Sequence, residues 1–263
     1  MAAPTIVVFD SGLGGLTVYR EVVKLLPAAR YVYCADDACF PYSARDETAL
    51  RSRVIDVMGR IVERYAPDLV VVACNTASTV VLPDLRARFD VPFVGTVPAI
   101  KPACAMSKTK LVSILGTEAT VSREYTQALI RDFAGDCEVT LVGSARLAAL
   151  AEADLRGDGV EDREISAEIA ACFVETAGRR TDVVVLACTH YPLLVERLRR
   201  LGPWPVEWLD PAPAIARRVD DLLGPEAGRQ DGGQDAPLAV FTSGKPPIEL
   251  LGRIGFEVAG EGL

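Results

Sequence analysis

Asp68-Leu69-Val70-Val71-Val72-Ala73-Cys74 decides the fold, because the same run recurs as Asp182-Val183-Val184-Val185-Leu186-Ala187-Cys188. A shift of 114 positions (68 to 182 and 74 to 188) matches the Asp, two Val, the Ala and the Cys, and leaves only Leu/Val and Val/Leu exchanges. A short, continuous β-branched run is typical of a strand buried on both faces of a parallel sheet. The carboxyl ends of such strands face the crevice in which open α/β sheets bind ligands. The sequence therefore predicts two thiols at two equivalent strand ends.

The repeat extends beyond these runs and predicts two related halves. Pro98-Ala99-Ile100 and Pro213-Ala214-Ile215 each follow an expected strand, and they are separated by 115 positions (98 to 213). The corresponding strands are 5–9 with 110–115, 30–35 with 138–143, the two Cys-ended runs, and 91–96 with 206–209. Helices are expected at 16–26, 45–65 and 77–88, and the chain is expected to close with a polar, Gly-rich mobile loop at 224–237, a strand at 238–242 and a helix near 246–253.

Strands that alternate with helices predict parallel βαβ units. The expected fold class is α/β, with two pseudo-symmetric, doubly wound parallel-sheet domains and the active site in the cleft between them. Pro98 and Pro213 follow equivalent strands, so we expect the chain to cross between domains near them. The domains expected are 1–97 plus 208–263 on the Cys74 side, and 98–207 on the Cys188 side.

Composition limits the classes of function. The chain has 263 residues, half of them hydrophobic and 24% charged, which is enough to bury a large core. No apolar run reaches membrane-spanning length and the N-terminus lacks signal-peptide features, so a cytoplasmic protein without membrane contact is expected. Seven cysteines, an odd number, fit a reducing compartment. The net charge of −8 argues against nucleic acid as a partner but not against an acidic small molecule.

The two repeated thiols are better candidates for chemistry than the other five cysteines. A lone Cys at the end of an apolar strand is usually packing. Cys74 and Cys188, however, stand at duplicate positions, each before hydrogen-bonding residues at an expected helix start, where thiolate is favoured. Asn75, Thr76 and Ser78 are potential caps of the first of these helices. The Gly-rich turn at 10–15 also predicts an anion-binding arrangement, without the spacing of a P-loop or dinucleotide motif.

Two rival chemistries explain the thiols less completely. Cys188-x-His190 offers two metal ligands, but no Cys-x-x-Cys completes a set and His190 is the only histidine, so no metal is expected. A Cys188 nucleophile with His190 as base leaves Cys74 unexplained. Two thiols that serve opposite faces of one carbon suit removal of a proton on one face and delivery on the other. That chemistry is racemisation or epimerisation.

At this point four blocks of the sequence resemble the signature blocks of bacterial glutamate racemase, in the aspartate/glutamate racemase superfamily. The blocks are Phe9-Asp10-Ser11-Gly12-Leu13-Gly14-Gly15, Pro41-Tyr42, Ala73-Cys74-Asn75-Thr76-Ala77 and Cys188-Thr189-His190-Tyr191-Pro192-Leu193. The resemblance covers nearly the whole chain in the right order. It implies interconversion of L- and D-glutamate without a cofactor, which supplies D-glutamate for peptidoglycan, and it implies a homodimer.

The resemblance also implies the roles of single residues. Cys74 would take the α-proton of D-glutamate and Cys188 that of L-glutamate, assisted by Asp10 and His190 respectively. The substrate would be held by Asp10, Ser11, Tyr42, Ser43, Asn75, Thr76, Thr117, Thr189 and His190. A simpler role for Asp10 and Thr76 is to cap their helices, and both roles can hold at once.

Departures from the family pattern and a second class of function stay open. Ser43 stands where the family usually has Gly, and a positive φ there would be costly for Ser. The stretch at 143–147 lacks the usual Cys-Pro, although Glu152 stands where the family often has an acid. Aspartate racemase shares the chemistry, but the Asp-Ser-Gly and Thr-His-Tyr-Pro blocks favour glutamate. The other class is a binding role, since some family members bind DNA gyrase; the intact thiols weigh against loss of catalysis.

Overall fold

The computed structural model describes residues 3–224 and 236–259. The chain divides into two compact units, one formed by Met1–Thr96 with Ala212–Leu263 and the other by Val97–Pro211. The sequence placed the boundaries at 97/98 and 207/208 instead. The second boundary lies later because the strand β10 (Glu207–Leu209) pairs with β9 (Val183–Ala187) and so belongs wholly to the second unit.

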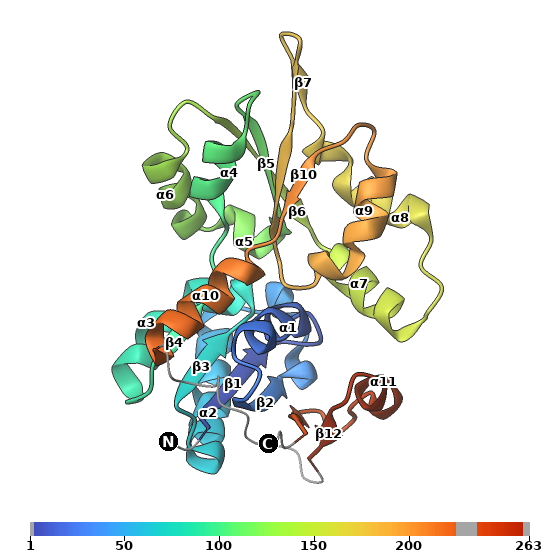
Figure 1. Cartoon of the computed structure of the whole chain (residues 1–263). Helices are drawn as coiled ribbons and strands as arrows, with labels where there is room; N and C mark the ends of the chain where they lie inside the picture. Colours follow the sequence, from blue (N-terminus) through green and yellow to red (C-terminus); the bar gives the residue numbers. More distant parts are fainter. Residues whose placement is uncertain (1–2, 225–235, 260–263) are drawn as a thin grey trace. The chain divides into compact units, whose positions relative to one another are not determined.

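The first unit contains a six-stranded sheet in the order β12-β11-β2-β1-β3-β4, and all of its strands are parallel (Figure 1). Its strands are β1 (Thr5–Asp10), β2 (Arg30–Ala35), β3 (Leu69–Val72), β4 (Phe93–Gly95), β11 (Leu238–Phe241) and β12 (Glu257–Val258). Its helices are α1 (Leu16–Leu25), α2 (Glu47–Tyr65), α3 (Asn75–Arg88), α10 (Ala212–Leu223) and α11 (Ile248–Arg253), with 3₁₀ turns η1 (Asp37–Cys39) and η2 (Tyr42–Ala44).

The second unit contains a parallel sheet in the order β10-β9-β5-β6. Besides β9 and β10, its strands are β5 (Leu111–Thr117), β6 (Glu138–Ser144) and the small antiparallel pair β7 (Glu175–Thr176) and β8 (Arg179–Arg180). Its helices are α4 (Ile100–Met106), α5 (Glu118–Ser122), α6 (Glu124–Phe133), α7 (Leu147–Arg156), α8 (Asp162–Ile169) and α9 (Val195–Leu201), with 3₁₀ turns η3 (Ala170–Cys172) and η4 (Tyr191–Leu194).

The two sheets repeat one topology. The order β2-β1-β3-β4 in the first unit recurs as β6-β5-β9-β10 in the second, with each strand in the corresponding place along the chain. The repeated runs form β3 and β9, which lie in the interior of their sheets and are buried along their whole length. The parallel α/β fold and the internal repeat expected from the sequence are therefore confirmed.

The helices α2 and α3 begin at other residues than the sequence predicted. α2 begins at Glu47 because the side chain of Asp46 accepts hydrogen bonds from the amides of Thr48 and Ala49, each at 3.0 Å. α3 begins at Asn75 rather than at residue 77, directly after the thiol. The loop expected at 224–237 lies mostly outside the described residues.

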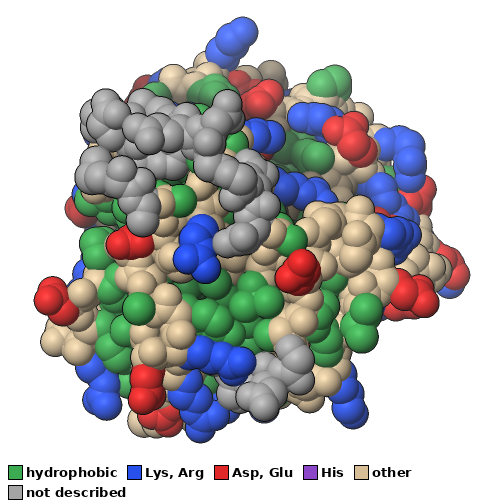
Figure 2. All heavy atoms as spheres, turned by 60° about the horizontal axis from the view of Figure 1, so that its bottom comes forward, with side chains coloured by type: hydrophobic (Ala, Val, Ile, Leu, Met, Phe, Trp, Pro, Cys, Tyr) green, Lys and Arg blue, Asp and Glu red, His purple; other side chains and the backbone are tan. Residues whose placement is uncertain are grey.

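No helix in the described part of the chain is long and apolar enough to cross a membrane. Figure 2 shows one face of the molecule, on which basic and acidic side chains are interspersed around a patch of hydrophobic side chains. On this face, the mixed charges differ from the continuous basic surface that neutralises a nucleic-acid backbone.

Candidate active site

Cys74 lies between the end of β3 and the start of α3. It is the N-cap residue of that 14-residue helix, a position at which the helix dipole favours negative charge. The side chain is buried, and its thiol donates to Ser11 Oγ at 3.8 Å. The structure thus brings together two residues that are 63 positions apart and that were both predicted for the site.

Two hydroxyl groups fix the backbone that leads into Cys74. Ser78 Oγ donates to the carbonyl of Val72 at 2.8 Å, and Thr96 Oγ1 donates to the carbonyl of Ala73 at 3.0 Å. The amide of Thr96 in turn donates to Ser78 Oγ at 3.0 Å. Ser78 was expected as a helix cap, but it bonds back to the strand and so holds the peptide units immediately before the thiol.

Asp10 is fully buried at the end of β1, next to β3. Its Oδ2 accepts a hydrogen bond from the amide of Gly12 at 3.0 Å. Gly15 passes so close that a Cβ there would lie 2.7 Å from the Cβ of Asp10, which explains the glycine. Gly15, and not Asp10, is the N-cap residue of α1, while the Asp10 carboxylate accepts from an amide of the turn that leads into the helix. Thr76, which was expected to cap α3, lies inside that helix, whose N-cap residue is Cys74.

Asn75 is the clearest sign of a ligand in the first unit. Its side chain is only 3% exposed, yet neither the amide oxygen nor the amide nitrogen has a hydrogen-bond partner among the described residues. Leaving a buried polar group unsatisfied costs on the order of 1–3 kcal/mol. An amide kept in this state beside Cys74 is suited to bind a polar group of a ligand.

Tyr42 packs in the same hydrophobic cluster as Cys74 and donates its hydroxyl proton to Asp36 Oδ2 at 2.7 Å. Burial and the neighbouring Asp36 charge raise the pKa of Tyr42 well above its usual value, so the hydroxyl stays protonated. Ser43 follows in η2 and is not among the described residues with positive φ. The strain considered for a serine at this position is therefore not present.

Cys188 follows β9 in the second unit and begins a row of hydrogen-bonded side chains. Its Sγ lies 3.8 Å from His190 Nδ1, and His190 Nε2 lies 2.9 Å from Glu152 Oε1. Arg156 donates to the other oxygen of Glu152 at 2.5 Å. The carboxylate partner assigns the imidazole proton to Nε2, because an oxygen of Glu152 can only accept it. The lone pair of Nδ1 then faces the thiol.

Glu152 was noted in the sequence but received no role. It lies on α7, 38 positions from His190, and only 3% of it is exposed. The spacing of the two residues in the sequence gave no sign of this contact, because it depends on the packing of α7 against η4. A carboxylate that orients a histidine is a recurrent arrangement in acid–base sites.

Thr117 and Thr189 lie at the same sheet edge as Cys188. Thr117 ends β5, which pairs with β9, and its Oγ1 accepts from the amide of Thr120 at 3.1 Å as the N-cap of α5. Thr189 is buried between Cys188 and His190. The predicted residues therefore form two groups, one at the carboxyl edge of each sheet. The first group comprises Asp10, Ser11, Tyr42, Ser43, Cys74, Asn75 and Thr76, and the second comprises Thr117, Cys188, Thr189 and His190.

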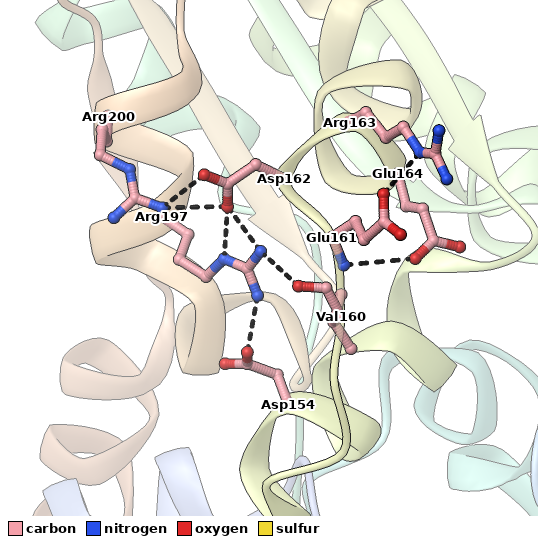
Figure 3. A network of polar contacts seen from close by, with 8 residues as sticks. All are labelled: Asp154, Val160, Glu161, Asp162, Arg163, Glu164, Arg197 and Arg200. Atoms are coloured by element: carbon pink, nitrogen blue, oxygen red, sulfur yellow. Dashed lines mark hydrogen bonds and ion pairs between the residues drawn. The ribbon is translucent and has the colours of Figure 1, made fainter.

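An ion-pair network fixes the helix that carries Glu152 (Figure 3). Arg197 Nη1 donates to Asp154 Oδ1 at 2.6 Å, while Arg197 Nε donates to Asp162 Oδ1 at 3.0 Å. Arg197 lies on α9, which follows the turn after His190, and Asp154 lies on α7. The network therefore ties α7, which carries Glu152, to the helix that follows His190 and η4 along the chain. Figure 3 also shows Val160, Glu161, Arg163, Glu164 and Arg200.

Within the described ranges, no group of three or more His, Cys, Asp or Glu side chains could hold a metal ion. All seven cysteines, which lie in the described ranges, are free thiols. The absence of a cofactor expected from the sequence stays a prediction.

Comparison with known proteins identifies the class of enzyme to which this site belongs. Residues 6–219 match the family described as Asp/Glu/Hydantoin racemase, and the chain belongs to this family of isomerases. The resemblance drawn from the four sequence blocks is thereby confirmed. A glutamate racemase from Brucella canis is 55% identical over 246 residues, which cover 93% of this chain and 89% of that protein.

Solved structures agree with this family. The Escherichia coli glutamate racemase, crystallised with L-glutamate and the activator UDP-MurNAc-ala, has a TM-score of 0.88 and 43% identity over 97% of both chains. The Thermus thermophilus glutamate racemase, crystallised with β-chloro-D-alanine, has a TM-score of 0.74 and 30% identity over 100% of this chain and 98% of that one.

Proposed function

We propose that this protein is a glutamate racemase that interconverts L- and D-glutamate by proton transfer between two thiols, without a cofactor. The observation that carries the proposal is the pair Cys74 and Cys188, which end equivalent strands and have different hydrogen-bond partners. The similarity to glutamate racemases from Brucella canis and Escherichia coli supports glutamate as the substrate.

In the L-to-D direction, Cys188 is the base. His190 Nδ1 accepts the thiol proton, and the resulting imidazolium is stabilised by its hydrogen bond to Glu152. The thiolate then takes the α-proton of L-glutamate, and Cys74 delivers its own proton to the opposite face of the carbanion. The product is D-glutamate, Cys188 is a thiol again with the α-proton, His190 holds the former thiol proton and Cys74 is left as a thiolate. The D-to-L direction runs the same steps in reverse, with Asp10 assisting Cys74.

The substrate carboxylate and the carbanion need hydrogen-bond donors. The first turn of α3, with Asn75 and Thr76, offers backbone amides and the unpaired side-chain amide described above. We assign substrate binding to these two residues together with Asp10, Ser11, Tyr42, Ser43, Thr117, Thr189 and His190. Donors that hold negative charge on the substrate lower the barrier to removal of the α-proton.

The wider role that we propose is supply of D-glutamate for peptidoglycan by a cytoplasmic homodimer. The support for this role is the family resemblance, together with the seven free thiols, which suit a reducing compartment. Light scattering coupled to size-exclusion chromatography tests the dimer. Failure of a D-glutamate auxotroph to grow when this chain is its only racemase would contradict the cellular role.

Incorporation of solvent deuterium tests the two-thiol mechanism. The purified protein is incubated with L-glutamate in D₂O, with chelator and without added pyridoxal phosphate, and the enantiomers are separated at low conversion. We expect the first D-glutamate to carry α-deuterium almost completely while the remaining L-glutamate stays protiated, because the delivering thiol has exchanged with solvent. The same experiment from D-glutamate should give the mirror result. Substantial transfer of the original protium into the product would refute the two-thiol assignment, and no turnover at all would refute the racemase assignment.

A further inference from the structure

Asp36 is a fully buried carboxylate at which several parts of the first unit meet. It accepts hydrogen bonds from Tyr42 at 2.7 Å, from Arg53 Nη2 at 2.6 Å and from Thr242 Oγ1 at 2.6 Å. Burial acts to raise the pKa of Asp36, but the hydrogen bonds from Arg53, Thr242 and Tyr42 outweigh it and hold the pKa below its usual value. The group is therefore a carboxylate that its donors hold in one position.

Thr242 comes from the far end of the chain, just after β11. The strand β11 pairs in parallel with β2, so both carboxyl ends reach the same sheet edge. Besides donating to Asp36, Thr242 Oγ1 accepts a hydrogen bond from the amide of Ala38 at 3.2 Å. The adjacent Ser243 donates its backbone amide to Asp37 Oδ1 at 2.9 Å and its hydroxyl to Asp37 Oδ2. The residues after β11 thus hold the loop at 36–39 through side chains and backbone.

This loop leads directly to Tyr42. Tyr42 is 2% exposed, and its environment includes Cys74 and Asp10, whose charges contribute to its raised pKa. The Asp36 carboxylate is the partner of the Tyr42 hydroxyl, so the position of the carboxylate decides where that hydroxyl lies. A shift of Asp36 would be passed to a substrate-binding residue beside the thiol.

We propose that Thr242 is a positioning residue of the racemase site. Its hydroxyl holds Asp36 and the Ala38 amide, and through Asp36 it fixes the hydroxyl of Tyr42, a residue of the same cluster as Cys74. The inference rests on the proposed function and deepens it, since it gives the C-terminal segment a part in substrate binding.

The pairing of β11 with β2 does not depend on the hydroxyl of Thr242. The amide of Thr242 already donates to the carbonyl of Ala35 at 3.1 Å, and β11 pairs with β2 along its whole length. Thr242→Val keeps that backbone bond and the shape of the side chain but removes the hydroxyl. Thr242→Ser keeps the hydroxyl. The pair of variants therefore separates the hydrogen bonds from the packing.

Steady-state kinetics measure the effect on substrate binding. We expect Thr242→Val to raise KM for both enantiomers about tenfold, which is the size expected for one lost hydrogen bond to a charged group, and to change kcat less. Thr242→Ser should restore KM to within about twofold. The matched control is Thr181→Val in the second unit, a buried threonine whose hydroxyl bonds to the backbone of Val174 and whose loss should leave KM unchanged.

A double-mutant cycle with Tyr42→Phe tests the route through Tyr42. If Thr242 acts by positioning that hydroxyl, Thr242→Val should add little to the KM of the Tyr42→Phe variant, because coupled residues are not additive. Independent, multiplied effects would overturn the proposal. An unchanged KM in Thr242→Val, or no rescue by serine, would overturn it as well.

Hydrogen exchange tests the contacts of Thr242 with the loop at 36–39 without a measurement of activity. In the intact chain, the peptide that covers 36–44 should exchange faster in Thr242→Val than in wild type or Thr181→Val, because the Ala38 amide loses its acceptor. Unchanged exchange would overturn the proposal even if the protein is a racemase. Faster exchange in a protein without racemase activity would support the contacts of Thr242 with Asp36 and Ala38 but reject the proposed function.

Discussion

Replacement of Glu152 by glutamine should impair the Cys188 half of the reaction. Glu152 is almost completely buried, with one oxygen 2.9 Å from His190 Nε2 and the other bonded to Arg156. Glutamine has the same shape and can still accept from His190 Nε2, but without the charge it stabilises less the imidazolium that forms when His190 takes the thiol proton. Packing of α7 should be retained.

The full contribution of this charged hydrogen bond sets the upper limit of the effect. A hydrogen bond to a charged group contributes about 1.5–3 kcal/mol, which corresponds to roughly 10- to 150-fold in rate. The two enantiomers have equal free energy, so kcat/KM must fall by the same factor in both directions. The fall in rate alone therefore does not show which thiol is affected.

Kinetic isotope effects identify the impaired thiol. With α-deuterated L-glutamate, whose deuteron Cys188 removes, the isotope effect on kcat/KM should increase in Glu152→Gln because that step becomes rate-limiting. With α-deuterated D-glutamate, whose deuteron Cys74 removes, it should decrease. Glu124→Gln, which removes a carboxylate from an exposed ion pair on α6, is the control and should change neither. A larger effect for D-glutamate, or equal increases for both, would refute the pairing of Glu152 with Cys188.

Cys74→Ala and Cys188→Ala should each lower the rate of racemisation, measured by optical rotation, by about 10²–10⁴-fold, the usual loss for one acid or base. Cys172→Ala is the control and should keep the rate, because burial raises the pKa of that thiol to about 12. Asn75→Ala should weaken glutamate binding in calorimetry without lowering the melting temperature, since the amide has no described partner to lose; a large fall in melting temperature would show a structural role. The pKa of Asp36 is lower in the folded than in the unfolded chain, so its stabilising effect is complete above the unfolded pKa of about 3.9 and is lost as the pH falls through the folded value. Denaturant titrations from pH 6 to pH 3 should therefore show a steeper loss of unfolding free energy in wild type than in Asp36→Asn.

The sheet positions of both thiols could be predicted because burial leaves a strong signal in sequence. A strand covered on both faces must be apolar along its whole length, so β3 and β9 stand out as β-branched runs. The bounds of β2 were also predicted to the residue, since its apolar run ends where Asp36 and Asp37 begin the loop. The candidate site residues could then be predicted, because the carboxyl ends of parallel strands lie at one edge of a sheet, where ligands bind.

The partners of the thiols were harder to predict, because they join segments with no common periodicity. Glu152 meets His190 across 38 positions, and Thr242 meets Asp36 across 206. Each pair depends on how a helix or strand packs, and polar residues on such elements resemble ordinary surface residues in the sequence. The start of α3 was missed for a different reason: Asn75 and Thr76 are typical capping residues, yet here they lie inside the helix.

The repeat also explains why the two thiols need different partners. Cys74 is followed at once by a 14-residue helix, whose first amides can stabilise negative charge on the sulfur. Cys188 is followed by a 3₁₀ turn and the seven-residue α9, which offer a much weaker dipole. His190 and Glu152 stand on that side and can take up the thiol proton instead. If the two thiols are to exchange roles in a reversible reaction, each must be able to act as both acid and base. The duplicated sheet thus supplies two equivalent positions, and the residues around them provide that ability by different means.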